Sequence, residues 1–447
     1  MQVLYIRMFK LMIWALILVG AYWSNKKYSS DFNRTNRGRK APSLSLCKCP
    51  RLISTGIFMR SITDPVLYSR SFVLMAAANL FTVSSIGAFF LFPLFITSHG
   101  GSKADIGIIM GTFALSAVVC RPWISEMIDS LGRKKSYTVG CLIMSLIPLA
   151  YLFFRGELAQ FYLPLLLVRV IHGVGLALCF TSAFTYIADI VPESRLNEGI
   201  GMFGITGLTG MGIGPVIGET LIRTFGFHIF FLSASIMATA GLCLQIALPE
   251  SYTRVTVESP ESFFSVLNRK KILIVALLAL LFGFALAASA GFVTPYAKEK
   301  HLAFISLYYI FYSSAAVLTR LLGGRLADRI GEDRIIPNSL FLAGAGLLLL
   351  IFLEGNFILI LSGLMSGCGH GFLFPCLNSL AIRDEPAQIR GKINGVFTGG
   401  IDAGVFLGSI ILGYIGDWAG FRVLFLVAGL SLPPGVWIYK LLKKSAK

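Results

Sequence analysis

The sequence is poor in charged residues, and acidic residues are the scarcer kind. Charged side chains make up 14% of its 447 residues, with 22 acidic against 39 basic residues, while 55% are hydrophobic. A soluble globular domain carries about 25% charged residues, so this composition excludes that class. Apolar runs of about twenty residues recur, the length that a helix needs to cross a bilayer. The chain is therefore predicted to be an all-α integral membrane protein.

The sequence also lacks the short motifs of common enzyme and pump sites. It contains no H-E-x-x-H, no phosphate-binding G-x-x-x-x-G-K-[ST], and no His or carboxylate cluster with metal-ligand spacing. We therefore expect neither an enzyme nor an ATP-driven pump, and no metal or cofactor.

Basic residues gather in alternate loops. One set of loops holds six of them, whereas the other set and the C-terminal tail hold most of the rest, from Arg133, Lys134 and Lys135 to Lys447. This asymmetry is the positive-inside signature. It predicts a multi-pass protein of the inner or plasma membrane with a cytoplasmic C-terminus. The net charge of +17 is then explained by topology and contact with the lipid bilayer, so no nucleic-acid partner is expected.

The first 70 residues form a basic extension with a short apolar run at residues 11–23. The run is either an additional anchor or part of an upstream extension that the working protein does not need, with Met59 as an internal start; we favour the second interpretation. Cys47 and Cys49 in this segment could bind metal or carry an acyl chain, but an isolated C-x-C is weak evidence for either.

Twelve spans are predicted after the extension. They lie at about 71–97, 104–125, 136–154, 158–187, 200–222, 226–247, 272–297, 303–326, 336–353, 356–382, 391–415 and 419–442. The longest connection, 249–271, separates an N-terminal six-helix bundle (71–248) from a C-terminal one (272–447). We read it as a cytoplasmic linker.

A motif repeated in the two halves supports this division. Arg121, Ser125, Asp129 and Gly132 follow the same order and spacing as Arg320, Gly324, Asp328 and Gly331. Each pair lies 199 positions apart (320 minus 121, for example). A fixed offset near half the chain length indicates internal duplication.

Twelve helices in two halves, with G-R-L-A-D-R-I-G after the second helix of a half, resemble the major facilitator superfamily. Arg169 and Gly173 in the fourth helix resemble its R-x-x-x-G element. Gly210, Gly214, Pro215 and Gly218 are similar to the G-x-x-x-G-P-x-x-G element of its drug:proton antiporter-like branch. The resemblance implies the major facilitator fold.

The resemblance also implies roles for the motifs. The loop motif would form a cytoplasmic gate, in which Asp129 and Arg133 latch the N-terminal half and Asp328 and Arg329 are their counterparts; alternatively these residues only set topology. The three glycines share one helix face, and Pro215 can kink the helix. They form either a hinge or proton-tight seal between the halves, or ordinary close packing.

Ionisable residues inside the membrane are costly, about 2.5–3.5 kcal/mol for Asp or Arg at a helix centre. Asp402 is the acid expected nearest mid-bilayer, roughly 15 Å from Lys392 at about 1.5 Å per residue. We predict that Asp402, together with His370, binds a proton or substrate, unless it forms a structural ion pair. Arg169 would be the fixed cation nearby. His172 and Asn79 are further candidates, although each histidine could simply bond a carbonyl.

The leading hypothesis is a monomeric secondary transporter that exports a small organic molecule in exchange for protons by alternating access. Proton-coupled uptake of a metabolite or sugar uses the same motifs and remains open. A receptor or scaffold with this fold is the third possibility, because fold does not fix function.

Overall fold

The structure is a computed structural model that describes residues 67–251, 263–330, 332–383, 385 and 389–445. Most of the N-terminal extension, including the run at residues 11–23 and Met59, lies outside the described residues. So does the central part of the linker, residues 252–262.

The N-terminal half is built from helices that match the six predicted spans. They are α2 (Arg70–Ala88), which continues through the 3₁₀ turn η1 (Phe89–Leu91) into α3 (Phe92–Ser98), then α4 (Lys103–Leu131), α5 (Arg133–Ala150), α6 (Leu158–Ile190) and α7 (Leu196–Ile246). The short 3₁₀ turn η2 (Tyr151–Phe153) follows α5, and a second one, η3 (Glu193–Arg195), precedes α7. Ser102 begins α4 with a capping box, in which its side chain bonds the Asp105 backbone N–H and Asp105 bonds back.

The C-terminal half repeats this order. After the short α8 (Phe263–Leu267) come α9 (Lys270–Ala287), the π-helical turn η4 (Ala288–Phe292), α10 (Val293–Glu299), α11 (Leu307–Ile330), α12 (Glu332–Leu349) with η5 (Leu350–Phe352), α13 (Asn356–Ile382), α14 (Arg390–Leu430) and α15 (Pro434–Ser445).

Two of these helices are too long for one crossing, and each reverses at a glycine. Gly226 in α7 has φ 79° and ψ −174°, and Gly420 in α14 has φ 80° and ψ 175°. In α7 the segments on both sides of the turn pack on the same part of α2, because Gly210 meets Ser84 and Gly241 meets Thr82. Each long helix is therefore a hairpin of two spans.

The spans agree with the predicted fold. In the described part of the chain, nine helical ranges are long and apolar enough to cross a membrane, and two of them contain the hairpins at Gly226 and Gly420. Together with α11 they account for the twelve predicted spans. The predicted all-α membrane architecture with twelve spans is confirmed.

The first spans of the two halves share a distortion that the sequence did not predict. The turns η1 and η4 begin at Phe89 and Ala288, which are 199 positions apart (288 minus 89). A distorted turn can leave backbone carbonyls without their usual partners within the helix. In each of these two turns, a side-chain hydroxyl donates to one carbonyl. Thr294 donates its hydroxyl to the Phe90 carbonyl at 2.8 Å, and Tyr309 donates to the Ser289 carbonyl at 3.0 Å.

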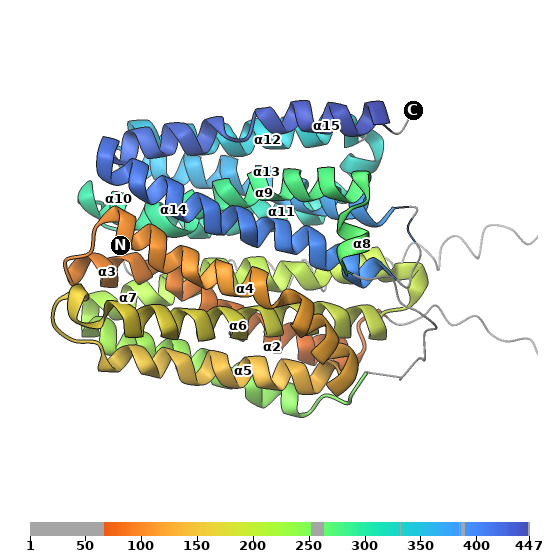
Figure 1. Cartoon of the computed structure of the whole chain (residues 1–447), viewed down its shortest axis with the longest axis horizontal. Coiled ribbons are helices and arrows are strands. Elements are labelled where there is room, and N and C mark those ends of the chain that lie inside the picture. The colour runs from red at the N-terminus through yellow and green to blue at the C-terminus, as the bar shows by residue number, and fades with distance from the viewer. Residues whose placement is uncertain (1–66, 252–262, 331, 384, 386–388, 446–447) are drawn as a thin grey trace, which may run out of the picture. The chain divides into compact units, whose positions relative to one another are not determined.

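The helices run roughly parallel to one another, with α4 packed along α14 and α7 against α11 where the halves meet (Figure 1). We call the end near α3, α10, Gly226 and Gly420 the hairpin end, at the left of Figure 1. The opposite end carries Arg133, Arg269 and their basic neighbours, and we call it the basic end.

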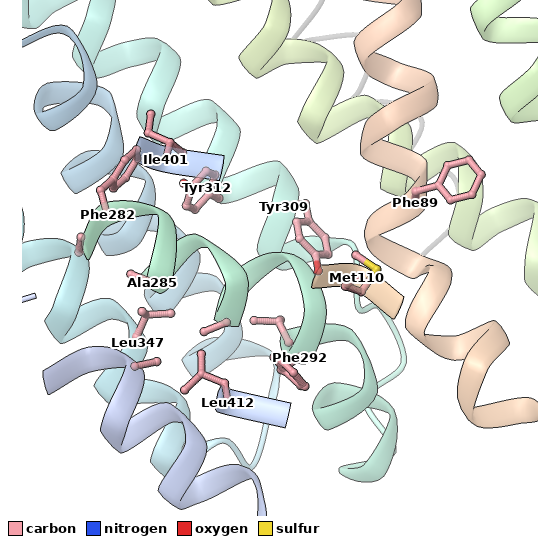
Figure 2. Packing of buried hydrophobic residues seen from close by; sticks show 14 of the residues in the cluster. Phe89, Met110, Phe282, Ala285, Phe292, Tyr309, Tyr312, Leu347, Ile401 and Leu412 are labelled. Carbon is pink, nitrogen blue, oxygen red and sulfur yellow. The ribbon is translucent and has the colours of Figure 1, made fainter. Parts of the chain in front are cut away.

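One large apolar core runs from the first span into the C-terminal half. It includes Phe89, Met110, Phe292 and Tyr309, with Phe90 stacked on Tyr309 at 5.1 Å between ring centres. Figure 2 shows part of this core, including Phe282 and Tyr312, whose rings both pack against His370.

Candidate functional site

The predicted mid-membrane acid forms an ion pair between the two halves. Arg121 of α4 binds Asp402 of α14 through Nη2, and its Nε donates to Asp402 Oδ2 at 3.1 Å. The side chain of Arg121 is 7% exposed and that of Asp402 is 20% exposed. Sequence analysis had placed Arg121 in the gate and Asp402 in the proton site, and the structure brings the two together.

Small residues allow this approach. A Cβ added at Gly399 would lie 3.4 Å from Arg121 Cδ, so the arginine rests on the glycine surface of α14. Toward the hairpin end, Gly107 of α4 packs on the backbone of Ser409. The predicted face of α14 that carries Gly399, Asp402 and Ser409 is therefore the face that α4 covers.

Arg169, in contrast, does not approach Asp402. It is 1% exposed, and its Nε donates to the Ile109 carbonyl at 3.3 Å. Its Cζ lies 4.4 Å from the Phe113 ring centre and 5.1 Å from that of Phe92, so two cation–π contacts surround it. Within the described chain its Nη1 has no hydrogen-bond partner.

The two histidines bond tyrosines, not carbonyls. His172 Nδ1 lies 3.1 Å from the Tyr151 hydroxyl, and His370 Nδ1 bonds the Tyr312 hydroxyl. Each contact stays within its own half. We find no group of three His, Cys, Asp or Glu side chains in the described residues that could hold a metal.

Asn79 belongs to a polar contact inside the N-terminal half. It is 4% exposed, and its Nδ2 donates to Thr206 Oγ1 at 2.9 Å. The amide thereby joins α2 to the part of α7 that precedes Gly226.

Two carboxylates close the hairpin end, each capping a helix of the other half. Asp417 of α14 accepts from the backbone N–H groups of Lys103 and Ala104 at 2.8 and 2.9 Å, at the start of α4. Glu219 of α7 accepts from Ile305 and Ser306 at 3.0 and 2.8 Å, just before α11. A carboxylate at a helix N-terminus satisfies unpaired N–H groups and the helix dipole.

The sequence analysis assigned no role to Glu219 or to Asp417. The available signal was their spacing of 198 positions (417 minus 219), within one residue of the motif offset.

Comparison with known proteins then decides the family. The sequence model of the Major Facilitator Superfamily matches residues 72–384 and 302–446. The chain belongs to the Major Facilitator Superfamily. Members are transporters, so this chain is a multi-pass membrane transporter and not an enzyme.

The matching relatives cover most of the chain. An uncharacterized MFS-type transporter of Methanocaldococcus jannaschii is 27% identical over 361 residues, which are 75% of this chain and 89% of that protein. The multidrug resistance protein MdtG of Escherichia coli is 25% identical over 361 residues, 78% and 87% respectively. A crystal structure of a POT family transporter with a thioalcohol conjugated peptide shares the fold, with a TM-score of 0.70 at 14% identity over 84% of this chain and 96% of that one. The resemblance to the drug:proton antiporter-like branch is confirmed.

The superfamily's glycine–proline element lies against the first span of its own half. Added Cβ atoms at Gly210 and Gly214 would meet the α2 backbone at Ser84, and one at Gly218 would meet Leu91 and Phe230. Pro215 lies inside α7 on this packed segment. The structure thus places the element in an α2–α7 contact, whereas Gly212, on another face, meets Ser313 of the C-terminal half.

The superfamily's loop motif is tied to its own half at the basic end. Gly132 joins α4 to α5 with φ 101°, and Glu250 accepts from the backbone N–H groups of Arg133 and Lys134 at 2.8 and 3.1 Å. Arg133 Nε also donates to Asp189 Oδ2 at 3.0 Å. Sequence analysis missed Asp189 and Glu250, because acids distant in sequence give no local pattern.

Other motif residues are only partly described. Ser125 lies in α4 and is partly buried. The side chains of Asp129, Asp328 and Arg329, the surroundings of Gly324, and Gly331 altogether lie outside the described residues. Arg320 lies in the middle of α11, far from the loop, with its Cζ 5.1 Å from the Phe374 ring centre.

Proposed function

We propose that this protein is a secondary transporter that exports a small organic molecule in exchange for protons, by alternating access of its two halves. The observation that carries the proposal is the Arg121–Asp402 ion pair, which joins α4 to the part of α14 that precedes Gly420. A carboxylate in this position can bind a proton, and the neutral acid no longer attracts Arg121 electrostatically. Proton binding and separation of the halves are then linked.

The second support is the closure at the hairpin end. Asp417, Glu219 and the Thr294–Phe90 hydrogen bond all join the halves there. With the basic end in the cytoplasm, as the loop charges predict, the structure corresponds to a state closed toward the outside. Loss of the Arg121–Asp402 pair would allow the halves to part at the basic end while the caps hold the outer end.

The choice of export over uptake rests on the relatives. MdtG carries the name of a multidrug resistance protein, and the glycine–proline element is that of the antiporter-like branch. We assign Asp129 and Arg133, with Asp328 and Arg329, to the cytoplasmic gate. His370 is assigned, together with Asp402, to proton or substrate binding.

The test is proton movement in proteoliposomes that contain purified protein and a pH-sensitive dye. A panel of candidate substrates would be added to wild type, to Asp402→Asn and to Glu157→Gln, an acid exposed at the hairpin end that serves as the matched control. We expect substrate-triggered proton flux in wild type and the control and its loss in Asp402→Asn. Flux that survives in Asp402→Asn would assign Asp402 to structure alone.

A further inference from the structure

The arginine of the duplicated motif is present in both halves, as Arg121 and Arg320. The acid that pairs with Arg121, Asp402, is present only once. Arg121 and Arg320 are 199 positions apart, and each projects from the middle of the second span of its half toward the other half. The position that matches Asp402 at this offset is Phe203 (402 minus 199), which is buried and packs edge-on against Phe184. Arg320 therefore has no counterpart of Asp402, the carboxylate that neutralises Arg121.

No other described side chain takes the place of that acid. Arg320 is partly buried, and its Nε is buried without a hydrogen-bond partner in the described part of the chain. None of the ion pairs among the described residues includes Arg320. Its Cζ lies 5.1 Å from the centre of the Phe374 ring. An uncompensated cation in mid-membrane is costly, and such residues commonly mark substrate pathways.

Glycines form the α7 surface opposite Arg320, and the guanidinium packs directly on Gly204, where an added Cβ would lie 2.3 Å from Arg320 Nη1. A Cβ added at Gly204 of α7 would meet only the Arg320 guanidinium among the described residues. One turn further along, a Cβ at Gly207 would meet only Asn79 Nδ2, at 3.8 Å. The glycine surface of α7 thus lies between a guanidinium and a buried amide, each of which can donate hydrogen bonds.

Resting on the proposed transport function, we infer that Arg320 binds an oxyanion on the transported molecule, a carboxylate, sulfonate or phosphonate group, with Asn79 as a second donor. A planar guanidinium forms paired hydrogen bonds with such groups. The Phe374 ring beside the guanidinium offers an apolar contact for an attached apolar or aromatic part. A cationic substrate would meet Arg320 without a compensating acid, so the site disfavours it.

The first experiment measures binding and needs no transport. Purified full-length protein in detergent is titrated with phenylphosphonate and benzenesulfonate, and with the neutral benzenesulfonamide, while thermal unfolding is followed. Ligands that bind the folded state raise the Tm. The variants are Arg320→Gln, Arg320→Lys and, as the control, Arg155→Gln at an exposed arginine outside the proposed site.

We expect the two anions, but not the sulfonamide, to raise the Tm of wild type. Arg320→Gln should weaken their apparent affinity roughly 10- to 100-fold, the effect of losing hydrogen bonds to a charged group, and Arg320→Lys should restore part of it. Arg155→Gln should retain the anion-dependent shift. Absence of an anion-dependent shift in wild type, or an equal shift in Arg320→Gln, would overturn the inference.

The flux assay separates this inference from the proposed function. Proton flux triggered only by cationic or neutral compounds, and unchanged in Arg320→Gln, would reject the anion site and leave the exchanger intact. Anion binding lost in Arg320→Gln without proton flux for any compound would support the site and reject proton exchange.

Discussion

At the scale of single residues, the fold depends on glycines whose backbone no other residue adopts readily. Gly132 has φ 101° and ψ 160°, a region populated almost only by glycine. A Cβ there would also lie 2.6 Å from Glu250 Oε2, the carboxylate that caps α5. Asparagine, which tolerates the left-handed helical region, would not relieve this strain.

We therefore expect Gly132→Ala to lower the free energy of unfolding by about 1–3 kcal/mol and to lower the Tm in detergent. The matched control is Gly201→Ala, because a Cβ at Gly201 meets no described atom within 4 Å and the residue is helical. That substitution should be neutral or slightly stabilising. Equal Tm values for the two variants would contradict this view of Gly132.

The Arg121–Asp402 pair gives a second residue-scale prediction. Removal of one partner leaves a charge or an unmet donor in a largely buried place, which costs about 3–5 kcal/mol. Arg121→Gln and Asp402→Asn should each lower the Tm. The double variant should lose clearly less than the sum of the two, as a double-mutant cycle by thermal unfolding would measure. Additive losses would show that the pair contributes no coupling energy.

At the scale of elements, the helix positions followed from apolar run length, but the irregular turns did not. The spans were predictable because each must satisfy its backbone bonds within lipid. The turns η1 and η4 were not, because their stability comes from Thr294 and Tyr309, hydroxyl groups brought to the freed carbonyls by packing. The start of α11 at Leu307, later than the predicted 303, likewise depends on Glu219 bonding Ile305 and Ser306.

The carboxylate caps predict an effect that crosses from one half to the other. Asp417→Asn should speed amide hydrogen exchange at Lys103 and Ala104, and Glu219→Gln should do so at Ile305 and Ser306. An N-cap is worth about 0.5–2 kcal/mol, so the local rates should rise roughly 2- to 30-fold. Mass-spectrometric hydrogen exchange would measure this, with Glu157→Gln as control. Unchanged exchange at these amides would show that the two caps do not stabilise the hairpin end.

At the scale of the whole molecule, the internal duplication made some features predictable from the sequence, whereas contacts between the halves were not predictable. The offset of 199 paired Arg121 with Arg320 and predicted two related bundles. It did not predict that Arg121 would meet Asp402, because that contact joins helices 281 positions apart and depends on how the halves dock. The expectation of Arg169 beside Asp402 failed for the same reason, since Arg169 packs inside its own half between Phe92 and Phe113.

We propose that a proton on Asp402 releases the two halves at the basic end. Leu131 and Leu441 are two exposed positions in different halves near that end. Double electron–electron resonance between spin labels at Leu131→Cys and Leu441→Cys would measure the distance between the halves. The background would be a cysteine-free variant that retains transport. We expect acid pH to lengthen the distance in wild type, and Asp402→Asn to show the long distance at every pH. A distance in wild type that ignores pH, or a variant that responds as wild type does, would contradict it.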